Sequence, residues 1–241
     1  MSKKLIKSLM HKAGFELHRL NPVSNPAFQL LKGFDHFGVD LVFDIGANTG
    51  QFCSELRSVG YKGRLISFEP LPEVCQALMA AAVHDPLWHV HSHIALGDTD
   101  GEIMINIAGN SVSSSILPML ETHSTAAEGS AFVDKVKVPI AQLDSVADEY
   151  LNKSEKYFIK IDTQGFEWEV LNGAQKTLAN AQGVLCELSL IPLYEGQRLW
   201  IELIERLETE GFTLWSIQKG FTDPYDGRTL QVDAIFFKVP D

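Results

Sequence analysis

The sequence predicts an α/β fold in which a mostly parallel sheet is covered by helices on both faces. From residue 41 onward, short apolar runs alternate with longer segments of helical periodicity, which is the pattern of a parallel sheet with crossover helices. Hydrophobic residues make up 45% of the 241 residues, enough for one sizeable core. Charged residues make up 21%, close to the globular average, which argues against disorder.

The predicted elements follow one another from residue 41 to the end of the chain. The first part predicts strand 41–43, helix 51–59, strand 64–68, helix 72–83 and strand 88–96. The second part predicts β segments 102–107 and 136–140, strands 157–161, 183–188, 213–217 and 232–239, and helices 142–151, 167–181 and 197–210. Between the two β segments, the polar residues 110–115 and 121–130 predict a loop or lid.

Residues 1–38 are predicted to form an N-terminal helical extension, and residues 39–241 the main domain, because Asn-Pro pairs interrupt the helical pattern before the regular region begins. Residues 1–20 hold five basic residues against one acid, a net charge of +4, with apolar residues at helical spacing. A basic amphipathic helix can contact an anionic membrane surface. We favour the alternative, a helix that packs on the domain with its lysines in water.

Composition also limits which binding partners and which cellular compartment we expect. The net charge of −11 disfavours a nucleic-acid partner, because an acidic body repels phosphate backbones. The three cysteines, Cys53, Cys75 and Cys186, offer no disulfide framework and no zinc motif. No apolar run approaches the roughly 20 residues of a membrane span, and no signal peptide is recognisable. These features predict a cytoplasmic protein.

A glycine loop follows the first strand, where residues 44–50 read Asp-Ile-Gly-Ala-Asn-Thr-Gly. In parallel sheets, ligands bind beyond the carboxyl ends of the strands. Glycines let the backbone approach a ligand, and the free N–H groups of the next helix suit a carboxylate or a phosphate. The spacing is neither the dinucleotide fingerprint nor a P-loop. Taken alone, the loop is equally consistent with a tight strand–helix turn.

Acidic residues follow the second and third predicted strands. Glu69 ends the second strand, one βα unit after Asp44, where a carboxylate can accept hydrogen bonds from both ribose hydroxyls. A ribose-binding acid without a pyrophosphate fingerprint indicates adenosine carried on something other than a diphosphate, and S-adenosylmethionine fits. Asp98, after the third strand, is a candidate for the adenine end, although it equally suits a turn.

Two further acids, Asp162 and Glu187, end the fourth and fifth strands, where we expect the methyl acceptor and the catalytic groups. An alkyl hydroxyl needs a base or a metal that lowers its pKa. The two carboxylates can hold Mg²⁺ through oxygen ligands, but we favour loop capping or substrate positioning without metal. Glu167 is predicted to cap the next helix. His89, His91 and His93 share a strand face away from this site, which indicates a partly exposed or packed histidine face rather than metal binding.

Several motifs occur in a fixed order along the chain. They are residues 42–52 around the glycine loop, 68–70 (Phe-Glu-Pro), 95–98 (Ala-Leu-Gly-Asp), 143–144 (Leu-Asp), 160–167 (Lys-Ile-Asp-Thr-Gln-Gly-Phe-Glu) and 171–174 (Leu-Asn-Gly-Ala). In combination they resemble the FkbM family of methyltransferases over about residues 40–240. The resemblance implies a class I methyltransferase (Rossmann-like) fold, with a seven-stranded sheet whose last strand is antiparallel.

The resemblance also implies S-adenosylmethionine as the cofactor and O-methylation of a sugar, glycolipid or natural-product acceptor by in-line displacement. By this likeness the methionine part of the cofactor contacts the glycine loop, Glu69 contacts the ribose and Asp162 lies on the acceptor side. Some relatives use a divalent metal with a nearby histidine, but no histidine follows Asp162 in this chain. The glycine-loop residues that the likeness assigns to the cofactor are Asp44, Gly46, Asn48 and Gly50.

Two other functions are compatible with an α/β fold of this kind. A nucleotide-sugar or NAD(P)-dependent enzyme is disfavoured because the loop lacks the third glycine of the dinucleotide pattern. A non-catalytic cofactor-binding module is disfavoured because Asp44, Glu69 and Asp162 are all present. Since fold alone does not decide function, turnover of an acceptor separates these alternatives.

Overall fold

The computed structural model describes residues 3–15 and 21–239. Within these residues, seven strands form one sheet in the order β3-β2-β1-β7-β8-β10-β9. Strands β1, β2, β3, β7 and β8 run parallel, and β10 runs antiparallel to both of its neighbours, which confirms the predicted fold class. The strands are β1 (Leu41–Ile45), β2 (Arg64–Phe68), β3 (Trp88–Val90), β7 (Tyr157–Ile161), β8 (Gly183–Ser189), β9 (Thr213–Lys219) and β10 (Gln231–Phe237).

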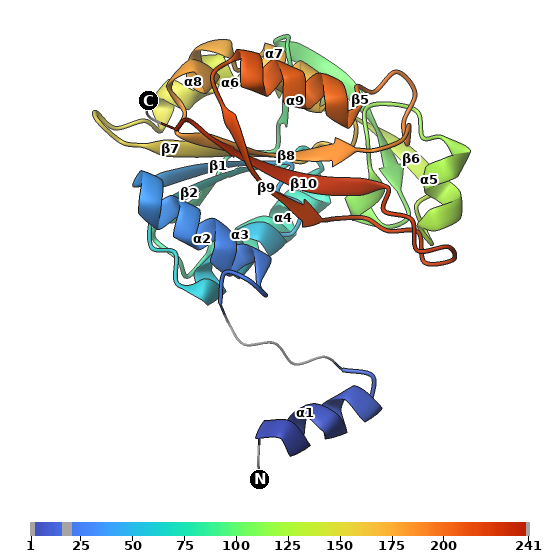
Figure 1. The fold of residues 1–241 in the computed structure, drawn as a ribbon. Helices are drawn as coiled ribbons and strands as arrows, with labels where there is room; N and C mark the ends of the chain where they lie inside the picture. Colours follow the sequence, from blue (N-terminus) through green and yellow to red (C-terminus); the bar gives the residue numbers. More distant parts are fainter. Residues whose placement is uncertain (1–2, 16–20, 240–241) are drawn as a thin grey trace.

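Helices cover both faces of this sheet (Figure 1). One face carries α2 (Pro26–Phe37), α3 (Gln51–Val59) and α4 (Pro72–Ala82). The other carries α6 (Leu143–Val146), α7 (Glu167–Asn172), α8 (Gln175–Asn180) and α9 (Trp200–Thr209). From β1 the chain adds β2 and β3 on one side of the sheet and then crosses to β7 on the other side of β1. The strand order therefore reverses between β1 and β7. Ligands of such sheets bind at this switch point.

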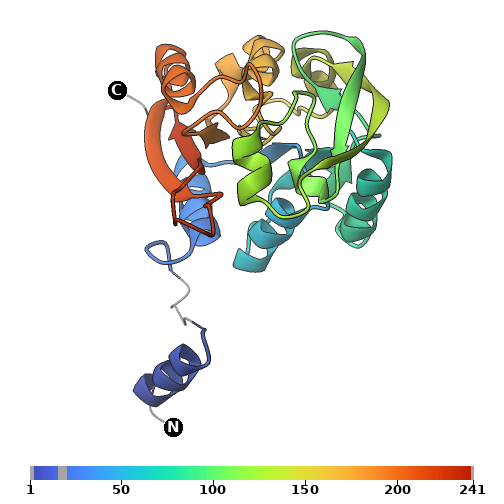
Figure 2. The ribbon, with the colours of Figure 1, turned by 90° about the vertical axis from the view of Figure 1, so that its right-hand side faces the viewer.

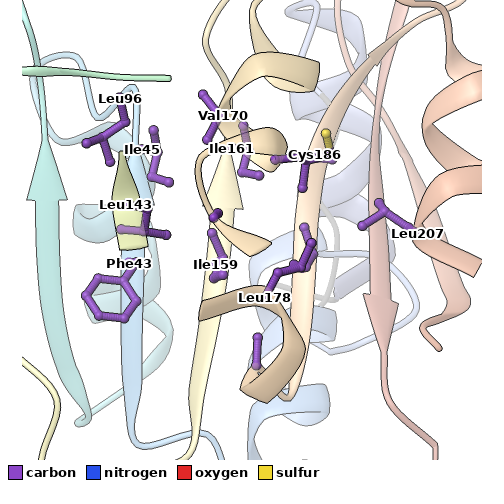
Figure 3. Close-up of a cluster of buried hydrophobic side chains, with 14 of the residues drawn as sticks. Phe43, Ile45, Leu96, Leu143, Ile159, Ile161, Val170, Leu178, Cys186 and Leu207 are labelled. Atoms are coloured by element: carbon purple, nitrogen blue, oxygen red, sulfur yellow. The ribbon is translucent and has the colours of Figure 1, made fainter. Parts of the chain in front are cut away.

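The core lies on both faces because successive strand residues point to opposite sides. Phe43 and Ile159 pack on the α6–α9 side with Val170 and Leu207 (Figure 3). Their neighbours along the strands, including Phe158, pack on the α2–α4 side. Because both faces are buried, the strands read as continuous apolar runs, which is why the sequence pattern revealed them.

The predicted strand 88–96 is wrong as a single element, because it divides between two sheets. β3 belongs to the large sheet, whereas β4 (Ala95–Leu96) pairs with β6 (Phe132–Ala141) in a smaller sheet. Polar residues 91–93 interrupt the apolar run, and the Ile94 N–H bonds to the Glu69 carbonyl as the backbone leaves β3. In the described parts of the chain, β5 (Gly101–Ala108) completes this second sheet, which has three strands in the order β4-β6-β5.

Two predicted helices are each divided into two shorter pieces. The helix predicted at 167–181 breaks into α7 and α8 at Gly173, where a Cβ would lie 1.8 Å from the Gly97 carbonyl oxygen. No residue with a side chain can fit against that backbone, which is why a glycine stands where α7 ends. The helix predicted at 142–151 is α6 followed by a 3-10 turn at Ala147–Glu149.

The predicted loop or lid contains two short helical pieces, a 3-10 turn at Ser111–Ser113 and α5 (Glu121–Ala126). Figure 2 views the molecule from the edge at which the parallel strands end, and this green segment lies across that edge. The segment therefore covers the side of the sheet where a ligand is expected.

Helix α2 is part of the hydrophobic core. Asn25 caps its first turn by accepting a hydrogen bond from the Phe28 N–H at 2.7 Å, and Gly38 ends it in the left-handed conformation. Its Leu30 and Phe34 pack against the sheet. The predicted boundary between residues 38 and 39 therefore falls between a packed helix and the strand that follows it, and the division into extension and domain stays a prediction.

Helix α1 (Lys3–Lys12) exposes its apolar residues, with Leu5 50% and Leu9 51% exposed. The predicted membrane contact concerns residues 1–20, of which residues 1–2 and 16–20 lie outside the described part, and it stays a prediction. None of the helices in the described ranges has the length and apolar character that a membrane crossing requires.

We predict that Asp144→Ala lowers the free energy of unfolding by about 1–2 kcal/mol, because Asp144 caps α8. Its carboxylate accepts hydrogen bonds from the N–H groups of Lys176 and Thr177 at 2.9 and 2.8 Å. Urea denaturation measures the change. The control is Asp148→Ala, which removes an exposed acid of the same segment. Equal losses in the two variants would contradict the capping role.

Candidate active site

A cavity of about 620 Å³ opens at the carboxyl ends of β1, β2, β7 and β8. Five of the residues predicted from the sequence line it: Gly46, Asn48, Glu69, Asp162 and Glu187. They come from four different strand ends, and the parallel arrangement of the sheet brings them to one place. The segment that lies across this edge, residues 110–130, is called the covering segment below. It contributes further lining residues, 110–116, His123 and Ala127.

The other three predicted residues lie outside the cavity lining. Asp44 is 0% exposed and lies within β1. Gly50 adopts a φ of 89°, and a Cβ there would lie 2.7 Å from the Trp88 ring. Asp98 is exposed, and its Cα lies near Gly173 at the break between α7 and α8. Their structural positions are therefore clear, and their predicted contact with the cofactor stays a prediction.

Lys160 is the site residue that sequence reasoning missed, and it joins β7 to β1. Its Nζ lies 3.2 Å from Asp44 Oδ1 and 3.4 Å from Asp162 Oδ2, and it donates to the Gly46 carbonyl oxygen at 2.9 Å. Burial alone would lower the pKa of Lys160, but the carboxylates of Asp162 and Asp44 raise it above its usual value. A charged residue inside an apolar strand was the available signal, since buried charges need partners.

The glycine loop packs directly on the end of β7. Gly46 has a φ of 73°, and a Cβ at this position would lie 1.8 Å from the Asp162 carbonyl oxygen. Glycine is required here because any side chain would push the two strand ends apart. The approach sets the position of Asn48, which follows with a φ of 46° and lines the cavity.

Glu69 forms the acidic wall of the cavity beside this loop. It is 5% exposed, and its two oxygens accept hydrogen bonds from the N–H groups of Asn48 and Leu71, both at 2.9 Å. Burial raises the pKa of Glu69 to about 7, although the two N–H donors favour the ionised form. Each carboxylate oxygen can accept a second hydrogen bond, so Glu69 can also bind a pair of hydroxyls.

The opposite wall holds a cluster of three acids, Asp162, Glu187 and Asp233, with two carboxamides between them. The Gln164 Nε2 donates to Asp162 Oδ1 at 3.0 Å and to Glu187 Oε2 at 2.8 Å. The Gln231 Nε2 donates to Glu187 Oε2 at 2.7 Å. Burial and the nearby Asp162 raise the pKa of Glu187 well above its usual value, and they raise the pKa of Asp233 to about 6.

Glu167 fixes the loop that presents Gln164. Its Oε1 accepts hydrogen bonds from the N–H groups of Thr163 at 2.9 Å and Gly165 at 3.1 Å, in a turn where Gln164 has a φ of 55°. Burial raises the pKa of Glu167 to about 7. Glu167 lies in the first turn of α7 as expected, but its side chain caps the preceding loop rather than the helix.

The donor set around Asp162 and Glu187 does not fit Mg²⁺. The side-chain carboxamide nitrogen of Gln164 (Nε2) lies between the two carboxylates and donates to both. The Lys160 ammonium lies 3.4 Å from Asp162. These donors compete with a cation that needs oxygen ligands. Across residues 3–15 and 21–239, no group of three or more His, Cys, Asp or Glu side chains could hold a metal ion.

Two of the three histidines of the third strand region contact one tyrosine. The ring of His89 lies 5.2 Å from the Tyr150 ring, and His91 Nδ1 forms a hydrogen bond with the Tyr150 hydroxyl. His93 is exposed. His89 is exposed as well, so these contacts agree with the interpretation of a partly exposed or packed histidine face.

The covering segment contacts both walls of the cavity. The Asn48 Nδ2 donates to Ser111 Oγ at 3.2 Å, and the Ser115 Oγ donates to the Gln164 carbonyl oxygen at 2.6 Å. The Tyr194 hydroxyl donates to Gln164 Oε1 at 2.9 Å. These bonds connect the glycine loop, the covering segment and the acidic cluster. The sequence carried no sign of the Tyr194 contact, because the residue lies in a loop far from the motifs.

A scan of the chain against protein families matches the methyltransferase FkbM domain over residues 44–214. The chain belongs to the FkbM methyltransferase family. It is therefore an S-adenosylmethionine-dependent methyltransferase, and the predicted family is confirmed. A search of the curated proteins found no match.

Solved structures of low sequence identity also resemble this FkbM methyltransferase. A proposed RNA methyltransferase from Pyrococcus horikoshii is 14% identical, with a TM-score of 0.46 and coverage of 90% of this chain and 84% of the other. Aeropyrum pernix fibrillarin with bound S-adenosylmethionine is 11% identical, with a TM-score of 0.43 and coverage of 82% and 66%. Human N-acetylserotonin methyltransferase, also with S-adenosylmethionine, is 12% identical, with a TM-score of 0.45 and coverage of 89% and 52%, so the chain spans about half of its length.

We predict that Lys160→Met lowers the free energy of unfolding by about 3–5 kcal/mol, because it leaves the fully buried Asp44 without its cation. Denaturation by urea measures the loss. In the double variant Lys160→Met/Asp44→Asn no buried charge remains at this position, so we expect part of the stability to return. A double variant that is less stable than the single variant would contradict the role of this ion pair.

Proposed function

We propose that the enzyme transfers the methyl group of S-adenosylmethionine to a hydroxyl of a sugar or sugar-like acceptor, carried on a glycolipid, a polysaccharide or a natural product. The observation that supports this most is the cluster of carboxyl and carboxamide groups on one cavity wall, formed by Asp162, Gln164, Glu187, Gln231 and Asp233. Hydroxyls both donate and accept hydrogen bonds, and such a wall offers both partners.

The opposite wall suits the cofactor. Glu69 would bind the ribose hydroxyls, and Gly46 and Asn48 would contact the methionine part near the N-terminus of α3, where free N–H groups favour a carboxylate. The remaining wall is apolar and suits adenine, with the side chains of Phe68, Leu71, Ile94 and Leu96. When bound, the cofactor supplies an electrophilic methyl group on a sulfonium.

Asp162 and Glu187 are the proposed catalytic groups. The Asp162 side chain is 33% exposed and is held by Lys160 and Gln164, so it is accessible from the cavity and fixed in direction. The acceptor oxygen attacks the methyl carbon as the carbon–sulfur bond breaks, and the hydroxyl proton passes to Asp162. Glu187, whose pKa is raised well above its usual value by burial, shares the Gln164 carboxamide with Asp162 and would orient the acceptor. This scheme needs no metal ion.

We predict that the affinity for S-adenosylhomocysteine rises with pH through about 7, because ribose hydroxyls bind the ionised form of Glu69, whose pKa burial raises to about 7. Below this pH, binding must release the Glu69 proton, so the affinity falls as the pH falls. Glu69→Gln is expected to weaken binding by about tenfold or more and to remove the proton release.

Calorimetric titration in buffers of different ionisation enthalpy measures both the affinity and the proton release. The control is Glu73→Gln, which changes an exposed acid at the start of α4 and should leave both quantities unchanged. A Glu69→Gln variant that keeps the affinity and the proton release of the wild type would exclude Glu69 from the cofactor site.

We predict that Asp162→Asn lowers kcat by about 10²–10⁴-fold, because an amide cannot accept the hydroxyl proton. Binding of S-adenosylhomocysteine should persist. Transfer of radiolabelled methyl groups to a panel of methyl glycosides measures turnover, with the exposed Asp134→Asn as the control. A wild-type enzyme that methylates amines and none of the hydroxyl acceptors would refute O-methylation, and an active Asp162→Asn variant would refute the role of the base.

A further inference from the structure

Helix α1 (Lys3–Lys12) has one apolar side, and the site described above does not use it. Apolar residues recur along this helix at spacings of one and four, which places them on the same side. They are Leu5, Ile6, Leu9, Met10 and, just after the helix, Ala13. The opposite side holds Lys4, Lys7 and His11, and residues 3–15 include no acid. Helix α1 is therefore amphipathic, with a basic polar side.

The apolar side of α1 is exposed. Ile6 is 38% exposed, Leu9 51%, and Phe15, which follows the helix, 62%. The Phe15 N–H donates to the Met10 carbonyl oxygen at 2.9 Å, so the chain turns back after the helix and keeps Phe15 beside its last turn. Figures 1 and 2 both show α1 apart from the other helices and from the sheets. The described part of the chain therefore does not bury this side.

The charge of α1 is opposite in sign to that of the rest of the chain. Its four lysines give residues 3–12 a net charge of +4. The whole chain carries −11, so the remaining residues carry −15. An anionic surface attracts α1 and repels the remainder, so contact with such a surface is made through α1.

The chain between α1 and α2 is long enough to separate the two charges. Thirteen residues, 13–25, lie between the two helices. A chain of this length reaches at most about 45 Å when fully extended, whereas charges are screened over about 8–10 Å at physiological ionic strength. Helix α1 can therefore lie on an anionic surface while the acidic part of the chain stays beyond the range of the repulsion.

We propose that α1 is a membrane-docking helix, which lies on a surface of anionic phospholipid with its apolar side among the acyl chains and its lysines at the headgroups. The acidic surface of a second copy would meet the lysines and leave the opposite, apolar side in water. The interface of a membrane takes both sides at once. Docking does not depend on the acceptor, but it would favour a glycolipid among the carriers proposed above.

Co-sedimentation of the whole chain with vesicles tests the docking. One set of vesicles consists of phosphatidylcholine alone, and the other of phosphatidylcholine and phosphatidylglycerol in equal parts. We expect at least about tenfold tighter binding to the anionic vesicles, because each lysine near such a surface contributes about fivefold. The preference should fall as salt is added, since salt screens the attraction.

Two variants with the same change of charge separate the apolar side of α1 from the rest of the segment. Leu9→Asp places a carboxylate in the middle of the apolar side, and we expect it to weaken binding to the anionic vesicles by about thirtyfold or more. Val23→Asp changes a residue that is 96% exposed and lies outside α1, and we expect an effect below about fivefold. The midpoint of thermal unfolding shows that each variant is folded.

Binding to anionic vesicles that is lost in Leu9→Asp and kept in Val23→Asp supports docking. A wild type that stays in solution with both kinds of vesicle overturns the inference, as does binding that Leu9→Asp leaves unchanged. Sedimentation velocity without vesicles tests the second copy as the partner. A dimer that Leu9→Asp dissociates, together with no vesicle binding, assigns the apolar side to self-association and also overturns docking. None of these outcomes depends on methyl transfer, which the Asp162→Asn experiment tests.

Discussion

The buried ammonium group of Lys160 is the interaction on which the site depends. It joins the carboxylate of Asp44 in β1 to that of Asp162 at the end of β7, and it also holds the Gly46 carbonyl oxygen. Two neighbouring strand ends and the glycine loop are therefore fixed by one cation. Because Asp44 is fully buried, water cannot replace this cation, and the loss of Lys160 would leave an unpaired charge in the core.

β10, the last strand of the chain, runs antiparallel to its neighbours and contributes Gln231 and Asp233 to the cavity. β10 runs opposite to β8, and its register places Asp233 opposite Glu187. The first residues of β10 thus lie at the edge where the parallel strands end. A parallel last strand would place its carboxyl end there instead. Gln231 and Asp233 therefore reach the proposed acceptor wall from the far end of the chain, while the proposed cofactor wall is built from the first two strands.

Sequence reasoning located the residues that stand directly at the ends of regular strands. Gly46, Glu69 and Asp162 follow apolar runs, and the parallel sheet then brings them into one cavity. It failed where the backbone leaves the regular pattern. The run at 88–96 divides between two sheets, and α7 ends early because Gly173 meets the Gly97 backbone. The polar residues 91–93 and Gly173 mark both places in the sequence, but the break itself depends in each case on a contact between distant segments.

The sequence by itself determined the fold class, the family and the strand ends that carry the glycine loop, Glu69 and Asp162, because hydrophobic period and short motifs are local properties. Only the tertiary structure decided that Asp44 is a buried partner of Lys160 and that Gln164 lies between two acids. These relations join residues from separate elements, and distance along the chain does not encode them.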